Sequence, residues 1–236
     1  MLDFLAIGAH ADDIEIGAGG TVAKLVALGR RGALLDLTDA SMGTRGTPAR
    51  RLEEAAAAAR ILGVDLRRNL GLRDGFLAPH EPEAIRLLVE VLRELRPRVV
   101  FTHPLRDRHP DHEACAALVR EACFKAGLAK FPAAGSPWRP GRIFHWLGAR
   151  DGEPDFCVDV TESWETRRRA LEAYPTQFAP LPGMPQTAIS GSSFQEVLEA
   201  RARHLGSRIR TVHAEGFTCE EIPEVVDPCA LAEREF

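Results

Sequence analysis

Two short polar segments hold the side chains best suited to chemistry. The first contains His10 and Asp13, and the second, much later in the chain, contains His109, Asp111 and His112. In each segment the polar groups are close enough to share one turn of backbone and to point at a common position. Imidazole nitrogens and carboxylate oxygens gathered in this way are typical ligands of a divalent cation. The two segments together predict one metal site.

The first segment lies where many proteins bind a cofactor. Residues 2–7 are a short apolar run that predicts a buried parallel strand, residues 17–29 predict a helix, and residues 8–16 form the loop between them. A dinucleotide-binding protein carries Gly-x-Gly-x-x-Gly in this loop. Here His10 and Asp13 replace two of those glycines, and the acidic groups of the loop would repel a phosphate. The loop therefore favours a cation.

Strand and helix patterns alternate through the first half of the chain. We expect further strands at residues 33–38, 66–70 and 99–102, and helices at 47–63, at 81–96 and after the second polar segment to residue 126. This order implies a parallel sheet with right-handed crossovers and strand order 3-2-1-4. The first and fourth strands are neighbours in that order. Both polar segments would then lie at adjacent carboxyl ends, where such sheets bind ligands.

The second half is less regular. We expect a long loop at residues 127–141 that covers the crevice or contacts another subunit, strands at 142–147 and 156–160, a helix from residue 161, a Pro-rich loop at 175–185, and a helix at 193–205 before an irregular tail. The fold class is therefore α/β, a Rossmann-like, doubly wound and mostly parallel sheet with a less regular C-terminal part. We expect residues 1–236 to form a single domain.

Composition limits the partners and the compartment. The chain has 236 residues, 45% of them hydrophobic, and a net charge of −4, without the basic face that nucleic acid requires. We find no secretory leader and no membrane span, so we expect a cytoplasmic protein. An odd number of cysteines without C-x-x-C spacing predicts neither a disulfide framework nor a zinc ribbon; they are Cys115, Cys123, Cys157, Cys219 and Cys229.

The ligand types suggest which metal is bound. His10, Asp13 and His112 offer two neutral nitrogens and one carboxylate, a set that suits Zn²⁺ with an open position. The same set also serves non-haem Fe²⁺, so the identity of the metal stays open. His103, which ends the fourth strand, is a rival for the third ligand position. His80, His145 and His204 lie outside either segment and are interpreted as surface or core residues.

The remaining polar groups predict hydrolysis. Zn²⁺ lowers the pKa of a bound water to about 7, and Asp12, beside the ligands, is placed to take the remaining proton. His109 could protonate a leaving amine or hold an oxyanion, with Asp111 orienting its ring. These parts suffice for metal-assisted hydrolysis of an amide. The alternative is that Asp12, Asp13 and Asp111 only cap helices.

These residues resemble a known family, the PIG-L/LmbE-like metal-dependent N-deacetylases. The closest likeness is to the bacillithiol biosynthesis deacetylases, which carry His-Ala-Asp-Asp where many relatives have His-Pro-Asp-Asp. The similarity covers nearly the whole chain and is carried by residues 9–17, 19–21, 43–47, 108–112, 172–178 and 214–217.

The resemblance implies roles for individual residues. By position, His10, Asp13 and His112 match the zinc ligands of the family, Asp12 its general base, and His109, supported by Asp111, its acid or oxyanion stabiliser. Arg51 matches an arginine near the substrate pocket, with Arg50 the neighbouring choice of register. One position departs from the family, because relatives have a tyrosine where this chain has Phe194, and the only tyrosine is Tyr174. The missing hydrogen-bond donor could come from elsewhere, with His213 as a candidate.

The implied substrate is an N-acetylglucosamine derivative, in the closest subfamily N-acetylglucosaminyl malate, hydrolysed to acetate and an amine. Guanidinium groups near the carboxyl edge would hold the malate carboxylates: Arg45, Arg50, Arg51, Arg73, Arg106 and Arg108. The resemblance also implies a homo-oligomer, with hexamers typical of the subfamily. Two alternatives stay open: a deacetylase of chitin fragments or of another N-acetyl sugar conjugate, and a non-catalytic ligand-binding protein on the same scaffold.

Overall fold

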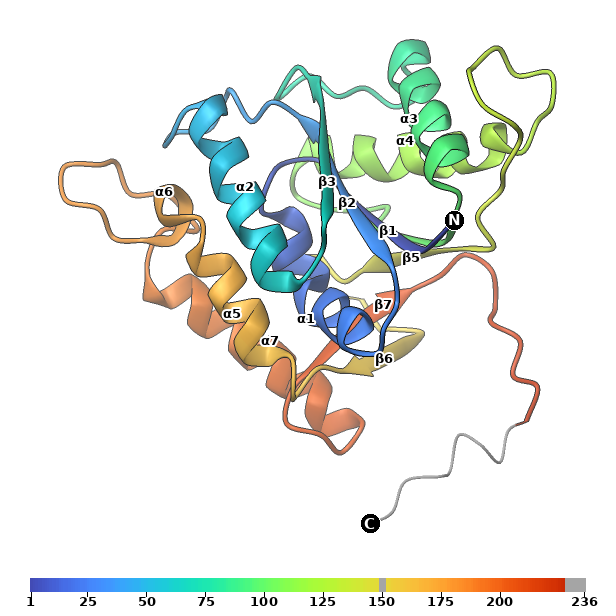
Figure 1. The fold of residues 1–236 in the computed structure, drawn as a ribbon. Coiled ribbons are helices and arrows are strands. Elements are labelled where there is room, and N and C mark those ends of the chain that lie inside the picture. Colours follow the sequence, from blue (N-terminus) through green and yellow to red (C-terminus); the bar gives the residue numbers. More distant parts are fainter. Residues whose placement is uncertain (149–151, 228–236) are drawn as a thin grey trace.

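A seven-stranded sheet with order β3-β2-β1-β4-β5-β7-β6 forms the centre of the protein in the computed structural model, which describes residues 1–148 and 152–227 (Figure 1). The first five strands of that order are parallel, whereas β7 runs antiparallel to both β5 and β6. The predicted fold class and the 3-2-1-4 core are confirmed. The strands are β1 (Leu2–Gly8), β2 (Gly32–Thr38), β3 (Leu66–Leu72), β4 (Pro97–Thr102), β5 (Arg142–Trp146), β6 (Phe156–Asp159) and β7 (Ala214–Thr218).

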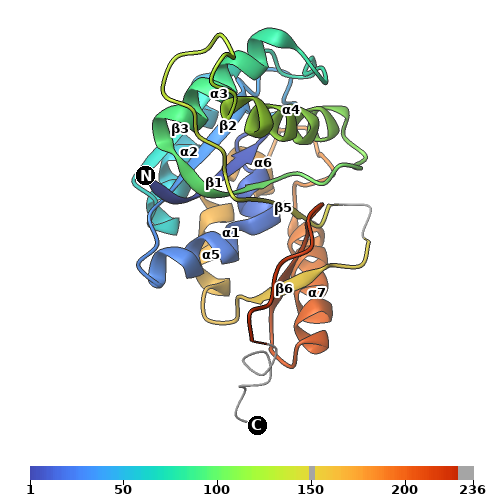
Figure 2. The ribbon, with the colours of Figure 1, turned by 90° about the vertical axis from the view of Figure 1, so that its right-hand side faces the viewer.

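Helices cover both faces of the sheet. Figures 1 and 2 show α3 and α4 on one face and α1, α2 and α5 on the other, with α7 beside β6 and β7. The helices are α1 (Asp13–Ala27), α2 (Pro48–Leu62), α3 (Pro82–Leu95), α4 (Pro110–Ala126), α5 (Trp164–Glu172), α6 (Pro175–Phe178) and α7 (Ser192–Arg208). None of the described helices is both long and apolar enough to cross a membrane.

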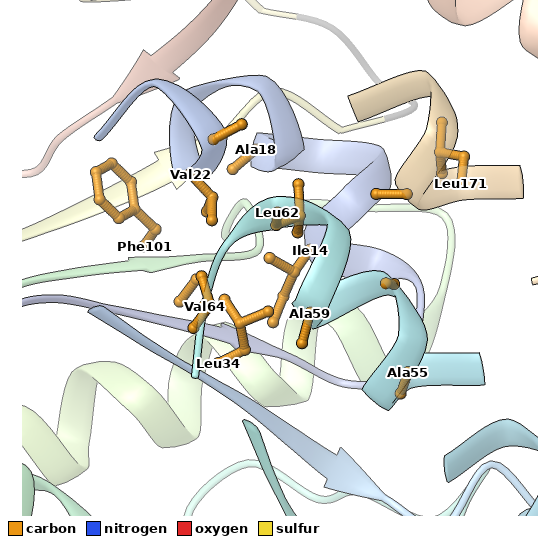
Figure 3. Packing of buried hydrophobic residues seen from close by; sticks show 14 of the residues in the cluster. Ile14, Ala18, Val22, Leu34, Ala55, Ala59, Leu62, Val64, Phe101 and Leu171 are labelled. Carbon is orange, nitrogen blue, oxygen red and sulfur yellow. The ribbon is translucent and has the colours of Figure 1, made fainter. Parts of the chain in front are cut away.

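Small residues let α1 and α2 lie close to the sheet. Figure 3 shows Ile14 of α1 among Leu62 and Ala59 of α2 and Leu34 of β2, all of them buried. Alanines on the inner face of α2 let the helix lie close to its neighbours, and the side chain of Thr47 accepts a hydrogen bond from the first turn. This packing fixes the start of α1, where the first polar segment lies.

Helix α1 begins earlier than the sequence pattern indicates and is broken in the middle. It starts at Asp13 rather than near residue 17, and Ala18 has a non-helical φ of −145°. Glu215 of β7 accepts hydrogen bonds from the amides of Gly20 and Thr21, at 2.8 and 2.7 Å, as an N-cap would. Arg167 of α5 donates to two carbonyl oxygens on the other side of the break. The periodic pattern marks only the second half of α1.

Strand β7 corrects the prediction of an irregular tail. Its residues follow α7 and insert between β5 and β6, a pairing over a long sequence distance that no local pattern indicates. The loop at 127–141 does not cover the crevice, and its contact with another subunit stays a prediction. Trp138 donates to the carbonyl oxygen of Pro97, at the amino end of β4, so the loop lies opposite the crevice. Cys115, Cys123, Cys157 and Cys219 are free thiols, and Cys229 lies outside the described residues.

We predict that Glu215→Gln lowers the free energy of unfolding by about 3 kcal/mol, because an amide would leave Arg167 without its carboxylate and would turn a donor toward backbone donors. Urea denaturation measures the change. Glu165→Gln, at an exposed position of α5, is the control and should change stability by about 0.5 kcal/mol or less. Equal stability of the two variants would show that Glu215 does not hold the break in α1.

Candidate active site

The pairing of β1 with β4 brings the two polar segments together. The strands are parallel, with Leu5 opposite Val100 and Ala6 opposite Phe101, so their carboxyl ends lie side by side. The loop after β1 carries His10, and the loop after β4 leads to His109 and His112 at the start of α4. The ring centres of His10 lie 4.8 Å from His109 and 5.4 Å from His112.

Asp13 lies between the two histidines expected to be ligands. Its Oδ2 atom is 3.2 Å from Nδ1 of His10, and its Oδ1 atom is 3.3 Å from Nε2 of His112. Ligand atoms that share one tetrahedral Zn²⁺ at its usual bond lengths lie about 3.3 Å apart. The three residues therefore fit a divalent cation. Two further sets have comparable spacing, His10 with His109 and Asp111, and His103 with Asp107 and His112.

His103 supports the first loop instead of standing free as a ligand. It is buried, and its Nε2 atom accepts a hydrogen bond of 3.0 Å from the backbone amide of Ala9. Its ring also stacks on that of His112, with centres 4.0 Å apart. Burial lowers the pKa of His103 to about 4, against the attraction of Asp13. The same Nε2 atom lies 3.1 Å from Oδ2 of Asp13, so this nitrogen is held by Ala9 and Asp13 together.

Asp12 is held under strain beside a buried guanidinium. Its φ of 126° is a conformation that residues other than glycine rarely adopt, and such strain is often found at functional sites. Its Oδ2 atom lies 3.1 Å from Nη2 of Arg51, which also donates to the carbonyl oxygen of Ala11. Burial raises the pKa of Asp12 to about 6, and the charge of Arg51 opposes that rise. A carboxylate with a pKa near neutrality suits a general base.

His109 and Asp111 interact differently from the prediction. His109 caps α4 through Nδ1, which accepts a hydrogen bond of 3.2 Å from the backbone amide of Asp111. The carboxylate of Asp111 makes no hydrogen bond to that ring among the described contacts, and it accepts hydrogen bonds from the amides of Gly75 and Leu77, at 2.8 and 3.3 Å. The main chain of Asp111 thus orients His109, while its side chain fixes the loop after β3. Burial and the nearby histidines lower the pKa of His109.

Two acids that the sequence analysis missed complete the cluster. Asp74 lies 3.1 Å from Nε2 of His10, and Asp107 lies 3.3 Å from Nδ1 of His112. Although burial opposes it, contacts with His112 and with backbone amides lower the pKa of Asp107 to about 2. Two features of the sequence could have identified these acids. Asp74 follows the end of β3 at the same sheet edge, and Asp107 precedes His109 by two residues.

Comparison with known proteins places the chain in a family. Residues 5–123 match the PIG-L family, described as GlcNAc-PI de-N-acetylase. This chain belongs to the PIG-L family. A diacetylchitobiose deacetylase from Thermococcus kodakarensis is 35% identical, over 74% of this chain and 69% of that protein. A 1D-myo-inositol 2-acetamido-2-deoxy-alpha-D-glucopyranoside deacetylase from Rhodococcus erythropolis is 26% identical, over 82% and 87%. The predicted family resemblance is confirmed.

The fold agrees with solved structures of similar proteins. The conserved protein TT1542 from Thermus thermophilus superposes with a TM-score of 0.88 at 40% identity, covering 97% of this chain and 98% of that one. The agreement extends over the C-terminal half, so β7 and α7 belong to the shared fold. The PIG-L sequence match itself stops within α4.

The arginines expected at the substrate pocket separate into two groups. Arg51 and Arg108 line a cavity of about 350 Å³ above the cluster of histidines and acids. Arg45 is buried instead and donates to the carbonyl oxygens of Ala179 and Pro185, at 2.9 and 2.7 Å. Arg50 is exposed and pairs with Glu53, because it lies on the outer side of α2. A substrate role for Arg45 and Arg50 is therefore corrected, and of the two neighbouring arginines on α2 it is Arg51 that lines the cavity.

An apolar wall faces the polar floor of the cavity. It consists of Trp146, Leu147, Ile189, Phe194 and Leu198. Phe194 occupies part of this wall and offers no hydrogen-bond donor. His213 lies elsewhere, because its ring stacks on Trp164 with centres 4.4 Å apart and it does not line the cavity. The proposal that His213 replaces the tyrosine donor of relatives is therefore wrong.

We predict that Arg45→Ala lowers the free energy of unfolding by about 3 kcal/mol, since two buried carbonyl oxygens would lose a charged donor. Arg50→Ala should change stability by about 0.5 kcal/mol or less, because its ion pair is exposed. Thermal and urea denaturation of both variants provide the measurement. A stable Arg45→Ala protein with a raised KM would instead support the role in substrate binding.

Proposed function

We propose that this protein is a metal-dependent deacetylase that hydrolyses the N-acetyl group of an N-acetylglucosamine derivative. One observation carries the proposal: Asp13 lies between His10 and His112 at ligand spacing, with Asp12 beside them at the floor of a cavity. Family membership supports it, since the similar diacetylchitobiose deacetylase and inositol-glycoside deacetylase act on N-acetyl sugars. The finer proposal is that the substrate is N-acetylglucosaminyl malate.

Metal binding and proton transfer are carried by different residues of this chain. A divalent ion held by His10, Asp13 and His112, Zn²⁺ or another such as Fe²⁺, would act as a Lewis acid and lower the pKa of water to about 7. Asp12 takes the proton from the attacking water, and Arg51 keeps enough of Asp12 ionised at neutral pH to do so.

His109 serves the second half of the reaction. The Nδ1 atom of His109 accepts a hydrogen bond from the backbone amide of Asp111, so the proton of the neutral ring is on Nε2. That N–H donates a hydrogen bond to the developing oxyanion, and the proton that Asp12 has taken from the water passes to the nitrogen of the leaving amine as the C–N bond breaks. Phe194 in the wall offers no hydrogen-bond donor, and we assign this role to His109, which lines the cavity beside the proposed metal ligands. The apolar wall packs against the sugar face and excludes water.

Charge at the mouth of the cavity favours an anionic aglycone. Arg108 is exposed and lines the cavity, so its guanidinium is free to approach the malate carboxylates. A chitin fragment would use the same floor without this contact, and the likeness to a diacetylchitobiose deacetylase keeps that substrate as the second candidate. The proposal also includes one catalytic domain over residues 1–236 in a cytoplasmic homo-oligomer, as in the bacillithiol deacetylases that the sequence resembles.

We predict that Asp12→Asn retains the metal and lowers kcat about 100-fold or more, because an amide cannot accept the proton. Asp13→Ala should lose both the metal and turnover, because the carboxylate between His10 and His112 is removed. Elemental analysis and amine release from an N-acetylglucosamine glycoside measure the two properties. Full activity in either variant would contradict the assignment, and a non-catalytic binding protein would show no amine release in any form.

We predict that the wild-type protein releases amine faster from N-acetylglucosaminyl malate than from diacetylchitobiose or N-acetylglucosamine. Arg108→Gln should raise KM for the malate glycoside up to about 5-fold, as expected for an exposed ion pair, and leave KM for diacetylchitobiose unchanged. Arg50→Gln, outside the cavity, is the matched control. A preference for diacetylchitobiose that Arg108→Gln does not alter would favour the second candidate.

A further inference from the structure

We propose that Asp74 and Asp107 are positioning residues of the metal site, each holding one ligand histidine by the ring nitrogen that faces away from Asp13. The inference rests on the proposed metal-dependent function and adds two residues to it. It also assigns the metal-facing atoms, which are Nδ1 of His10 and Nε2 of His112.

The first half of the argument is the placement of His112 between two carboxylates. Nε2 of His112 lies 3.3 Å from Oδ1 of Asp13, and Nδ1 lies 3.3 Å from Oδ2 of Asp107. The ring therefore presents opposite nitrogens to opposite acids. Its face is held as well, because it stacks between His103 and His109, with ring centres 4.0 and 4.6 Å away. Little rotation of the ring is available.

His10 is held in the same way but with its two nitrogens exchanged. Nδ1 lies 3.2 Å from Oδ2 of Asp13, and Nε2 lies 3.1 Å from Oδ1 of Asp74. Asp111 is also near Nε2, at 3.4 Å, although both of its oxygens already accept hydrogen bonds from the loop after β3. Asp74 makes the shorter contact and Asp111 accepts a hydrogen bond from Nε2, so both acids favour a proton on this nitrogen, and Asp74 is the one whose facing oxygen has no backbone donor among the described residues.

Each acid is fixed by the backbone through its other oxygen. Oδ1 of Asp107 accepts hydrogen bonds from the amides of Arg108 and His109, at 2.5 and 3.1 Å. Oδ2 of Asp74 accepts one of 2.8 Å from the amide of Met42. Both residues are buried, with 7% and 5% of their surface exposed. The oxygen that faces each histidine is therefore held at a defined position.

A fixed carboxylate selects the tautomer of the ring that it faces. A neutral imidazole carries one N–H, and a carboxylate can only accept, so the proton stays on the facing nitrogen. The lone pair is then on the opposite nitrogen, where a metal is bound. Asp74 selects Nε2–H in His10, and Asp107 selects Nδ1–H in His112. Both lone pairs consequently point toward Asp13.

The competing arrangement uses the other face of His10. Its Nε2 atom, with His109 and Asp111, forms one of the sets close enough for a cation. In that arrangement Asp74 would lie beside the metal, and Nδ1 of His10 would carry the proton. The two arrangements predict opposite tautomers for His10, so the ring itself reports which one is correct.

The first experiment is NMR of the zinc-loaded wild-type protein labelled with ¹⁵N-histidine. The ring ¹⁵N shifts identify the protonated and the metal-bound nitrogen of each ligand histidine. We expect zinc on Nδ1 of His10 and on Nε2 of His112. Zinc on Nε2 of His10 would overturn the inference, whereas a protein that binds no zinc at all would count against the proposed function instead.

The second experiment uses Asp107→Asn and Asp74→Asn, which keep the side-chain shape. Because the backbone amides keep the carbonyl oxygen, the new NH₂ group must face the ring, and a donor there favours the opposite tautomer. We expect each variant to bind Zn²⁺ about 10-fold to 100-fold more weakly, measured by competition with a chromophoric chelator.

Asp39→Asn is the matched control for both variants. Asp39 lies in the same region and accepts hydrogen bonds from the amides of Ser41 and Asp74, at 3.0 and 3.4 Å, without facing a histidine. The Asp39→Asn protein should bind Zn²⁺ with the affinity of the wild type. Zinc affinity in Asp107→Asn and Asp74→Asn equal to that of the control would refute the positioning role. If one variant fails to fold, the other carries the test, since the two acids lie in different loops.

Discussion

The parallel pairing of β1 with β4 is the constraint on which the site depends. Each strand delivers a loop to the same edge of the sheet, and the register between Leu5 and Val100 sets how the loops face one another. A shift by one residue would turn every side chain of a strand to the other face, so the buried core on both sides of the sheet protects that register. The site is positioned by hydrophobic packing far from its own polar atoms.

Buried negative charge is the second constraint. Carboxylates crowd the floor of the cavity and its surroundings, all at most 7% exposed: Asp12, Asp13, Asp74, Asp107 and Asp111. Buried acids at such short distances repel one another unless cations or hydrogen bonds compensate them. Arg51 compensates Asp12, and backbone amides compensate Asp74, Asp107 and Asp111. The described polar contacts of Asp13 are with histidine rings and one backbone amide, so a divalent cation fits beside it.

The C-terminal half supports the site from a distance. Glu215 and Arg167 hold the break in α1, and Thr176 donates to the buried Glu54 of α2 through its hydroxyl, at 2.6 Å. Arg45 fixes the loop before α7, which supplies Ile189 to the cavity wall. Motifs in residues 43–47, 172–178 and 214–217, which resemble the family, thus include contacts that join the two halves. Their chemistry is structural, since they set the shape of the cavity around the polar floor.

The sequence alone determined the α/β class, the 3-2-1-4 strand order and the meeting of His10, Asp13, His109 and His112, because apolar periodicity and crossover handedness act locally and allow few topologies. Tertiary structure alone decided which arginine reaches the cavity, where β7 inserts, and that Asp74 and Asp107 face the histidines. Arg50 and Arg51 are adjacent in sequence, yet Arg51 is buried at the cavity and Arg50 faces solvent. Contacts between loops depend on the directions of side chains from distant elements, and residue spacing along the chain does not predict those directions.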